Sequence, residues 1–91
     1  MAGPSGAADG SSAGGAGGDV VVLDVRGLEP PEPMVRTLEA LERLPEGATL
    51  VQLNVRVPQF LLAELEARGF TYEVREQREG LVRLFIRRWA L

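Results

Sequence analysis

The sequence predicts an α/β fold, an α+β two-layer sandwich in which two helices cover one face of a four-stranded mixed sheet. Three observations support this prediction. Four runs of β-branched and aromatic residues are typical of strands, two intervening segments have helical apolar spacing, and proline or glycine marks the boundaries. The resulting order, β-α-β-α-β-β, packs most simply with both helices on the same face of the sheet.

Residues 1–18 differ sharply from the rest of the chain. They hold seven of the 11 glycines, a single charged residue, Asp9, and no aromatic or branched aliphatic side chain. Such a segment cannot bury enough apolar surface to offset the entropy of ordering it. We therefore expect a flexible tail over 1–18 and one folded domain over 19–91, too small to enclose a deep, dry active-site cavity.

The first strand and the first helix are separated by a proline-rich segment. A β-branched run over 19–26, ended by Gly27, is typical of a buried or nearly buried strand. Residues 28–33 are too rich in proline for a helix interior or a sheet, but proline is tolerated in a first helical turn. The helix that follows presents four apolar side chains on one face: Met34, Val35, Leu38 and Leu41. Proline and glycine at 44–47 close it.

The second strand is expected over 49–55, with two alternating sets of side chains. One set comprises Val51, Leu53 and Val55, and the other comprises Leu50, Gln52 and Asn54. A second helix begins at Pro58 and ends at Arg68 and Gly69, because a cation followed by glycine is a common helix end. Its apolar side chains are Leu61, Leu62 and Leu65.

The last two strands, over 70–76 and 81–88, are expected to form a hairpin around 77–80. One face of the resulting sheet has no covering layer. In the final strand, the side chains expected to face the helices are Val82, Leu84 and Ile86. The open face then carries Leu81, Arg83, Phe85 and Arg87. Four further residues are expected to join them: Glu73, Arg75, Gln52 and Asn54.

Two interpretations of this open face remain. In the first, it is a solvated surface whose arginine and glutamate side chains pair across strands. In the second, it is a docking surface with Phe85 as the anchor and arginines around it. The arginines concerned are Arg75, Arg83 and Arg87. The clustering of Arg83, Phe85 and Arg87 is the observation that supports the second interpretation, and both interpretations stay open.

The composition excludes several classes of chemistry. The chain has no Cys and no His, and all ten of its basic residues are Arg. Disulfide scaffolds, zinc sites built on Cys or His, thiol nucleophiles, Schiff-base lysines and Ser-His-Asp triads therefore have no residues to form them. Every serine lies within 1–18, outside the expected domain. We expect no catalytic residue, no cofactor and no metal site, and hence no enzyme.

Charge and hydropathy limit the expected partners and location. The formal net charge of −3 argues against nucleic acid as a partner, because duplex-binding modules are usually basic. No apolar run approaches the length of about 18 residues that spans a bilayer. The N-terminus has neither the basic flank nor the apolar core of a secretion signal. We therefore expect a cytoplasmic protein without a membrane partner.

The segment 23–33, Leu-Asp-Val-Arg-Gly-Leu-Glu-Pro-Pro-Glu-Pro, resembles the opening of the TusA-like (SirA-like) sulfur-carrier superfamily. In that family a strand is followed by the pattern G-L-x-C-P-x-P and a helix. The residues that match are Gly27, Leu28, Pro31 and Pro33. The resemblance extends over essentially all of 19–91, and it implies the same β-α-β-α-β-β sandwich.

The chain departs from this family at its reactive residue. The cysteine that carries the persulfide aligns with Pro30, which has no nucleophile, and the two methionines are thioethers. Sulfur transfer by this chain is therefore excluded. The helix N-terminus is also a poor site for an anion. Pro30, Pro31 and Pro33 have no N–H group to donate, and Glu29 and Glu32 add negative charge.

A cysteine-free branch of the superfamily, bacterial domains of unknown function with a D-x-R-x-L-x-P-P opening, resembles the chain more closely. The matching residues are Asp24, Arg26, Leu28, Pro30 and Pro31. Those domains often carry N-D-H-D-P after the second strand, where this chain has Asn-Val-Arg-Val-Pro at 54–58. Arg56 stands in place of the histidine, so no metal or acid–base role carries over. The resemblance implies an association with hemerythrin-like and cupin domains in respiratory or nitrogen-oxide contexts.

Three charged residues are expected beside the proline-rich loop. Asp24, Arg26 and Arg56 follow neighbouring strands, and ligands of open α/β sheets tend to bind at the carboxyl ends of strands. Arg26 and Arg56 suit an anion clamp, because guanidinium groups match carboxylate, sulfate or phosphate. The alternative is that Asp24 pairs with one of these arginines and fixes the loop. The loop residues included in this candidate site are Glu29, Pro30 and Pro31.

The leading functional hypothesis is a non-catalytic protein-interaction module on a sulfur-carrier-like fold. We expect it to bind an unidentified partner protein through the loop 26–33 or through the open face around Phe85. The alternative function is a small-anion or metabolite-sensing domain that uses Arg26 and Arg56. A homodimer through the open face is a structural alternative.

Overall fold

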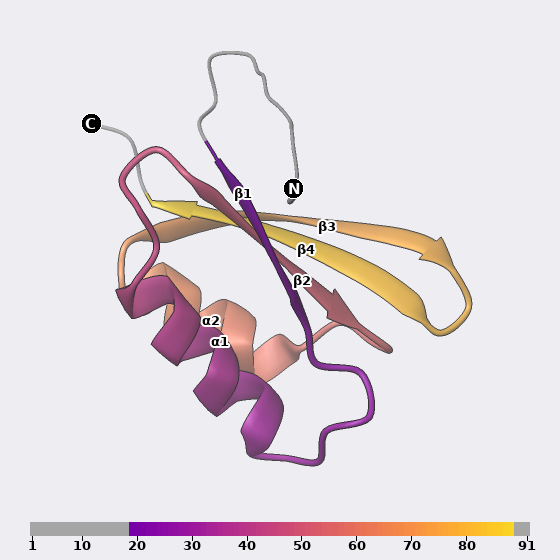
Figure 1. The fold of residues 1–91 in the computed structure, drawn as a ribbon. Helices are drawn as coiled ribbons and strands as arrows, with labels where there is room; N and C mark the ends of the chain where they lie inside the picture. The colour runs from indigo at the N-terminus through magenta and orange to yellow at the C-terminus, as the bar shows by residue number, and fades with distance from the viewer. Residues whose placement is uncertain (1–18, 89–91) are drawn as a thin grey trace, which may run out of the picture.

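The helices and strands follow the predicted order through the computed structural model, which describes residues 19–88 (Figure 1). The elements are β1 (Val20–Asp24), α1 (Glu32–Glu42), β2 (Thr49–Asn54), α2 (Gln59–Ala67), β3 (Phe70–Arg78) and β4 (Leu81–Arg88). The hairpin connection is shorter than expected, because β3 continues through 77–78. The tail expected over 1–18 lies outside the described residues, as do 89–91 of the expected domain. No helix within 19–88 is long and apolar enough to cross a membrane.

The strands form one mixed sheet in the order β1-β2-β4-β3. β1 runs parallel to β2, and β4 is antiparallel to both of its neighbours, β2 and β3. Helices α1 and α2 lie together on one face of this sheet, and no other element covers the opposite face within the described part of the chain (Figure 1). The structure thus confirms the predicted α/β two-layer sandwich, in which both helical crossovers pass on the same side.

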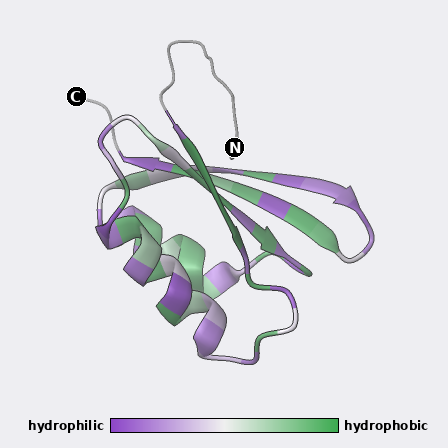
Figure 2. Ribbon diagram, viewed as in Figure 1, coloured by the Kyte–Doolittle hydropathy of each residue, from purple (hydrophilic) through white to green (hydrophobic). Residues whose placement is uncertain are grey.

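The hydrophobic core lies between the helices and the sheet, and Figure 2 shows the apolar residues of both layers. Leu50, Leu65, Leu84 and Ile86 are fully buried in it. Burial of each such side chain contributes roughly 1.5–3 kcal/mol relative to leaving it exposed. Val82 is also buried, so the prediction that alternate residues of β4 face the helices is confirmed.

Helix α1 and strand β1 bury less apolar surface than predicted. Val35 is 42% exposed, whereas Thr37 and Leu41 are the buried residues of α1. The expected place of Val35 on the core face was therefore wrong, since the buried stripe passes through Thr37. The prediction of a buried first strand was also wrong. β1 lies at the edge of the sheet, and its outward side chains Val20 and Val22 are 63% and 60% exposed.

Gln52 and Asn54 are buried, on the same side of the sheet as the core, so their expected place on the open face was wrong. Gln52 pairs across the strands with Leu84, and cross-strand partners share a face. Both amides have hydrogen-bond partners inside. Asn54 Nδ2 donates to Gln52 Oε1 at 3.0 Å, and Gln52 Nε2 donates to Thr37 Oγ1 at 2.7 Å. That hydroxyl donates in turn to the carbonyl of Pro33 at 2.7 Å, which makes burial of these polar groups tolerable.

Candidate functional site

The loop 25–31 between β1 and α1 is anchored at its start and exposed beyond it. Val25 is buried, and its N–H donates to the carbonyl of Leu53 at 3.0 Å. Gly27 has a φ of +89°, a left-handed backbone that glycine adopts readily, and Leu28 N–H closes the turn on the Val25 carbonyl at 3.2 Å. The predicted site residues of this loop are exposed: Glu29, Pro30 and Pro31.

The start of α1 offers few hydrogen-bond donors to a ligand. Pro31 occupies the N-cap position and Pro33 lies in the first turn, and neither has an N–H group. The N–H of Glu32 donates to the carbonyl of Glu29 at 2.8 Å. The side chains of these two glutamates add negative charge to the exposed segment. This geometry agrees with the sequence argument that the helix N-terminus is a poor anion site.

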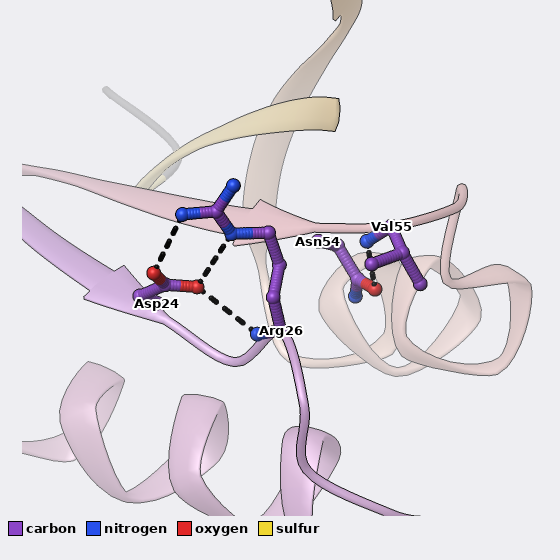
Figure 3. A network of polar contacts seen from close by, with 4 residues as sticks. All are labelled: Asp24, Arg26, Asn54 and Val55. Carbon is purple, nitrogen blue, oxygen red and sulfur yellow. Dashed lines mark hydrogen bonds and ion pairs between the residues drawn. The ribbon is translucent and has the colours of Figure 1, made fainter. Parts of the chain in front are cut away.

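Asp24 and Arg26 form a two-pronged ion pair at the end of β1 (Figure 3). Arg26 Nε donates to Asp24 Oδ1 at 3.0 Å, and Nη2 donates to Oδ2 at 2.9 Å. The backbone N–H of Arg26 donates to the same Oδ1 at 3.0 Å. These hydrogen bonds lower the pKa of Asp24 from 3.8 to about 2 and raise the pKa of Arg26. The pair therefore closes the backbone turn that leads into the loop.

Arg56 lies apart from this pair, in a shallow groove between the segment after β2 and the end of the β3–β4 hairpin. The groove has a volume of about 470 Å³. Its lining residues are Val55, Arg56, Val57, Glu76, Arg78, Glu79, Gly80 and Val82. Within 19–88, Arg56 forms no ion pair. The structure thus joins Asp24 to Arg26 and places Arg56 beside the hairpin.

The open face of the sheet carries an apolar patch formed by β1, β2 and β4. The strand register aligns Val22, Val51 and Phe85 in one row across the sheet. Leu53 lies beside this row in β2, and Val20 lies beside it in β1. Val20 and Val22 are mostly exposed, Leu53 and Phe85 are partly buried, and Val51 is buried in the middle. We call these five residues the open-face patch.

Exposed arginines border the open-face patch on the side of β3 and β4. Arg75 lies with its guanidinium carbon 5.0 Å from the centre of the Phe85 ring, and its Nε donates to Glu73 Oε2 at 2.9 Å. Arg83 and Arg87 are exposed and form no ion pair within 19–88. The structure therefore places Arg75, Arg83, Phe85 and Arg87 on one face, as predicted. Of the three arginines, only Arg75 has a carboxylate partner among residues 19–88.

Sequence reasoning missed the valine and leucine residues of this patch and one further aromatic residue. Val20 and Val22 lie in a run that predicts a buried strand, and the prediction for β2 placed the opposite set, Gln52 and Asn54, on the open face. The register with β4 decides this point, because Val51 lies opposite Phe85. Phe60, at the start of α2, is 87% exposed. Nothing in the local sequence distinguishes it from the buried leucines that follow.

The β-α-β-α-β-β order and the mixed four-stranded sheet define a two-layer α/β domain with a SirA-like fold. The family model described as "uncharacterized conserved protein (DUF2249)" matches residues 22–88, and the chain belongs to this family. The crystal structure of a SirA-like protein from Desulfitobacterium hafniense is similar, with a TM-score of 0.59 and 28% sequence identity. The match covers 72% of this chain and 93% of that chain. No curated protein matches the chain.

Proposed function

We propose that this chain is a non-catalytic protein-interaction domain built on the SirA-like fold. The observation that carries the proposal is the open-face patch, an apolar surface with exposed arginines on a sheet face that no element of 19–88 covers. Exposed apolar surface rimmed by polar side chains is typical of protein-binding sites. The same proposal places the domain in a bacterial cytoplasm.

The chemistry of the loop supports a role in binding rather than in catalysis. Pro30 occupies the position of the sulfur-carrier cysteine, and the whole chain has no thiol. Residues 19–88 contain no group of three or more acidic side chains that could share a metal ion. The exposed residues 26–31 of the loop then offer their shape and charge to a partner, and the Asp24–Arg26 pair fixes the start of the loop.

Affinity capture with the full-length tagged chain tests this proposal. Partners from a host lysate are identified by mass spectrometry for the wild type, Phe85→Asp and Arg26→Ala. Phe60→Asp serves as the matched control, because Phe60 is an exposed aromatic residue on the helical layer. We expect a partner that wild type and Phe60→Asp retain and that one of the other variants loses. Circular dichroism confirms that each variant is folded. Capture that no variant affects, or no enriched protein at all, contradicts the proposal.

A second candidate function is the sensing of a small anion or metabolite. It is favoured by Arg56, which is exposed and forms no ion pair within 19–88. Arg56 lines a groove together with Arg78 and two glutamates, Glu76 and Glu79. Arg26 contributes less to this function, because its Nε and Nη2 are bonded to Asp24. A respiratory or nitrogen-oxide context, implied by the family resemblance, suggests nitrite among the anions to test.

Thermal unfolding with a panel of carboxylates, phosphate, nitrite and sulfur oxyanions tests the sensing function. A ligand that binds only the folded state stabilises it by RT ln(1 + L/Kd), where L is the free ligand concentration, so the melting temperature rises with the ligand concentration. We expect one anion to stabilise the wild type and to lose this effect in Arg56→Ala. Arg43→Ala, which removes an exposed arginine from the end of α1, is the control. An unchanged melting temperature across the panel eliminates this candidate.

A further inference from the structure

We propose that the open face binds an acidic amphipathic helix of a partner protein. This inference rests on the proposed interaction function and deepens it, because it assigns the binding surface and the chemistry of the partner. It depends on the apolar row across the sheet, on the unpaired arginines beside it, and on the way in which helices already cover the opposite face.

The open-face patch has the form of a helix-binding surface. Val22, Val51 and Phe85 form a continuous apolar row over three adjacent strands, because the register places them side by side. The backbone groups of β2 and β4 are used within the sheet, so a partner that lies over these two strands must be recognised through side chains. On the opposite face the sheet accepts α1 and α2, whose buried leucines contact the same strands. A helix on the open face completes a second helical layer on this sheet.

The arginines on this face specify an acidic partner. On β3 and β4 this face carries three arginines, Arg75, Arg83 and Arg87, and one carboxylate, Glu73, which leaves a surplus of two positive charges. Asp24, beside Leu53 at the end of β1, is paired with Arg26, so this pair does not change the surplus. This surplus occurs on a chain whose formal net charge is −3. Arg83 and Arg87 have no carboxylate partner within 19–88. Carboxylates that flank the apolar stripe of an incoming helix would provide one, in the planar geometry that guanidinium groups prefer.

Charge and aromatic content argue against two other occupants. A symmetric dimer through this face would bring together two surfaces with the same surplus of positive charge, because each copy adds three arginines from β3 and β4 and one glutamate, Glu73. A single-stranded nucleic acid requires aromatic rings on which bases stack. The open-face patch offers only Phe85, which is partly buried and already has the Arg75 guanidinium 5.0 Å from its centre.

Fluorescence anisotropy with designed peptides and the full-length chain tests the proposal. The acidic probe is a labelled peptide of about 18 residues, long enough to become helical when bound, with leucines at i, i+3, i+4 and i+7 and flanking glutamates. The basic probe has lysine at every glutamate position. We expect the wild type to bind the acidic probe at least about 10-fold more tightly than the basic probe.

Two charge-reversal variants separate local from general electrostatics. Arg83→Glu removes an exposed arginine from the open face, and we expect it to weaken binding of the acidic probe at least about 10-fold. Arg36→Glu changes the total charge equally but lies on α1. It is expected to change the affinity by no more than about twofold. Phe85→Ser, checked for folding by circular dichroism, is expected to abolish binding.

Several results would overturn the proposal. In the anisotropy experiment these are equal or absent binding of the two probes, or an unchanged affinity in Arg83→Glu. Displacement of the acidic probe by single-stranded oligouridylate would indicate a nucleic-acid site instead. A wild-type dimer that Phe85→Ser dissociates in sedimentation experiments would indicate a dimer interface. The broader interaction function stands even then if affinity capture finds a partner that depends on Arg26. The interaction function itself fails if neither Phe85→Asp nor Arg26→Ala reduces the capture of any partner.

Discussion

The Nε2 atom of Gln52 donates a 2.7 Å hydrogen bond to the hydroxyl of Thr37, and this bond joins the central strand β2 to helix α1 inside the apolar core. The chain of bonds continues at both ends. Thr37 donates to Pro33 in the first turn of α1, and the side-chain oxygen of Asn54 accepts the N–H of Val55 at 2.7 Å. The loop before α1 and the segment after β2 are thus fixed relative to each other through buried polar groups.

Thr37→Val is expected to destabilise the fold by about 1–3 kcal/mol. Valine has nearly the shape of threonine, so the change leaves no cavity, but it leaves the buried Gln52 Nε2 without its acceptor. Urea unfolding measures the change in the free energy of unfolding. The double variant Thr37→Val/Gln52→Leu should lose less stability than the two single variants together, with a coupling of at least about 0.5 kcal/mol. Additive losses would show that the two side chains act independently.

The order of the elements could be predicted because their boundaries are local. Prolines precede both helices, and Gly27, Gly47, Gly69 and Gly80 occupy turns with positive φ, where glycine is favoured. The orientation of β2 could not be predicted in the same way. Either of its alternating sets contains apolar residues, and only pairing with β4 and the bonds available to Gln52 decide which set is buried.

In the candidate site, too, contacts between residues close in sequence could be predicted, and contacts between distant residues could not. Asp24 and Arg26 are two residues apart, so their pairing was among the alternatives that the sequence offered. Arg56 lies beside the β3–β4 hairpin because β2 has β1 on one side and β4 on the other. This neighbourhood is set by the order of the strands in the sheet and not by local sequence. The apolar character of the open face also depends on the strand order, because the open-face patch is formed by residues of three neighbouring strands.

The pKa of Asp24 is expected to depend on Arg26. It lies at about 2 instead of 3.8, mainly because of the hydrogen bonds from the Arg26 side chain and backbone. In Arg26→Ala the side-chain bonds are lost, so the pKa should rise toward 3.8 in an NMR titration of the Asp24 carboxyl carbon. Arg36→Ala, which breaks an exposed pair on α1, should leave this pKa unchanged. A low pKa that persists in Arg26→Ala would show that the backbone N–H at position 26, and not the guanidinium, is its main cause.

The same pair gives the stability of the protein an acid dependence of known sign. The pKa of Asp24 is lower in the folded state than its ordinary value, so folding favours the ionised carboxylate. Its stabilising contribution is therefore fully present above about pH 4 and is lost as the pH falls from about 4 toward about 2. Urea unfolding of the wild type and Asp24→Asn across this interval should give curves that converge at low pH. Parallel curves would contradict the linkage.

Substitutions on the two faces of the sheet are expected to lower the free energy of unfolding by very different amounts. Leu84→Ala removes a fully buried side chain from the core and should destabilise the protein by about 2–5 kcal/mol. Val22→Thr alters an exposed residue of the open-face patch and keeps the β-branched shape, so the change should stay within about 0.5 kcal/mol. Urea unfolding measures both. A large loss in Val22→Thr would indicate that something covers the patch in the isolated protein.

Arg88 is expected to stabilise the C-terminal end of α1. Its Nη1 donates to the carbonyl of Leu44 at 2.8 Å and its Nη2 donates to that of Leu41 at 3.2 Å, although Arg88 lies at the end of β4. A cation at this position satisfies free carbonyls and opposes the negative end of the helix dipole. Arg88→Met retains much of the apolar stem but loses these bonds, and it should lower the free energy of unfolding by about 1 kcal/mol. Arg87→Met, on the open face one residue earlier, should change it by less than about 0.5 kcal/mol. Equal losses in the two variants would mean that the guanidinium of Arg88 contributes no specific support to the helix.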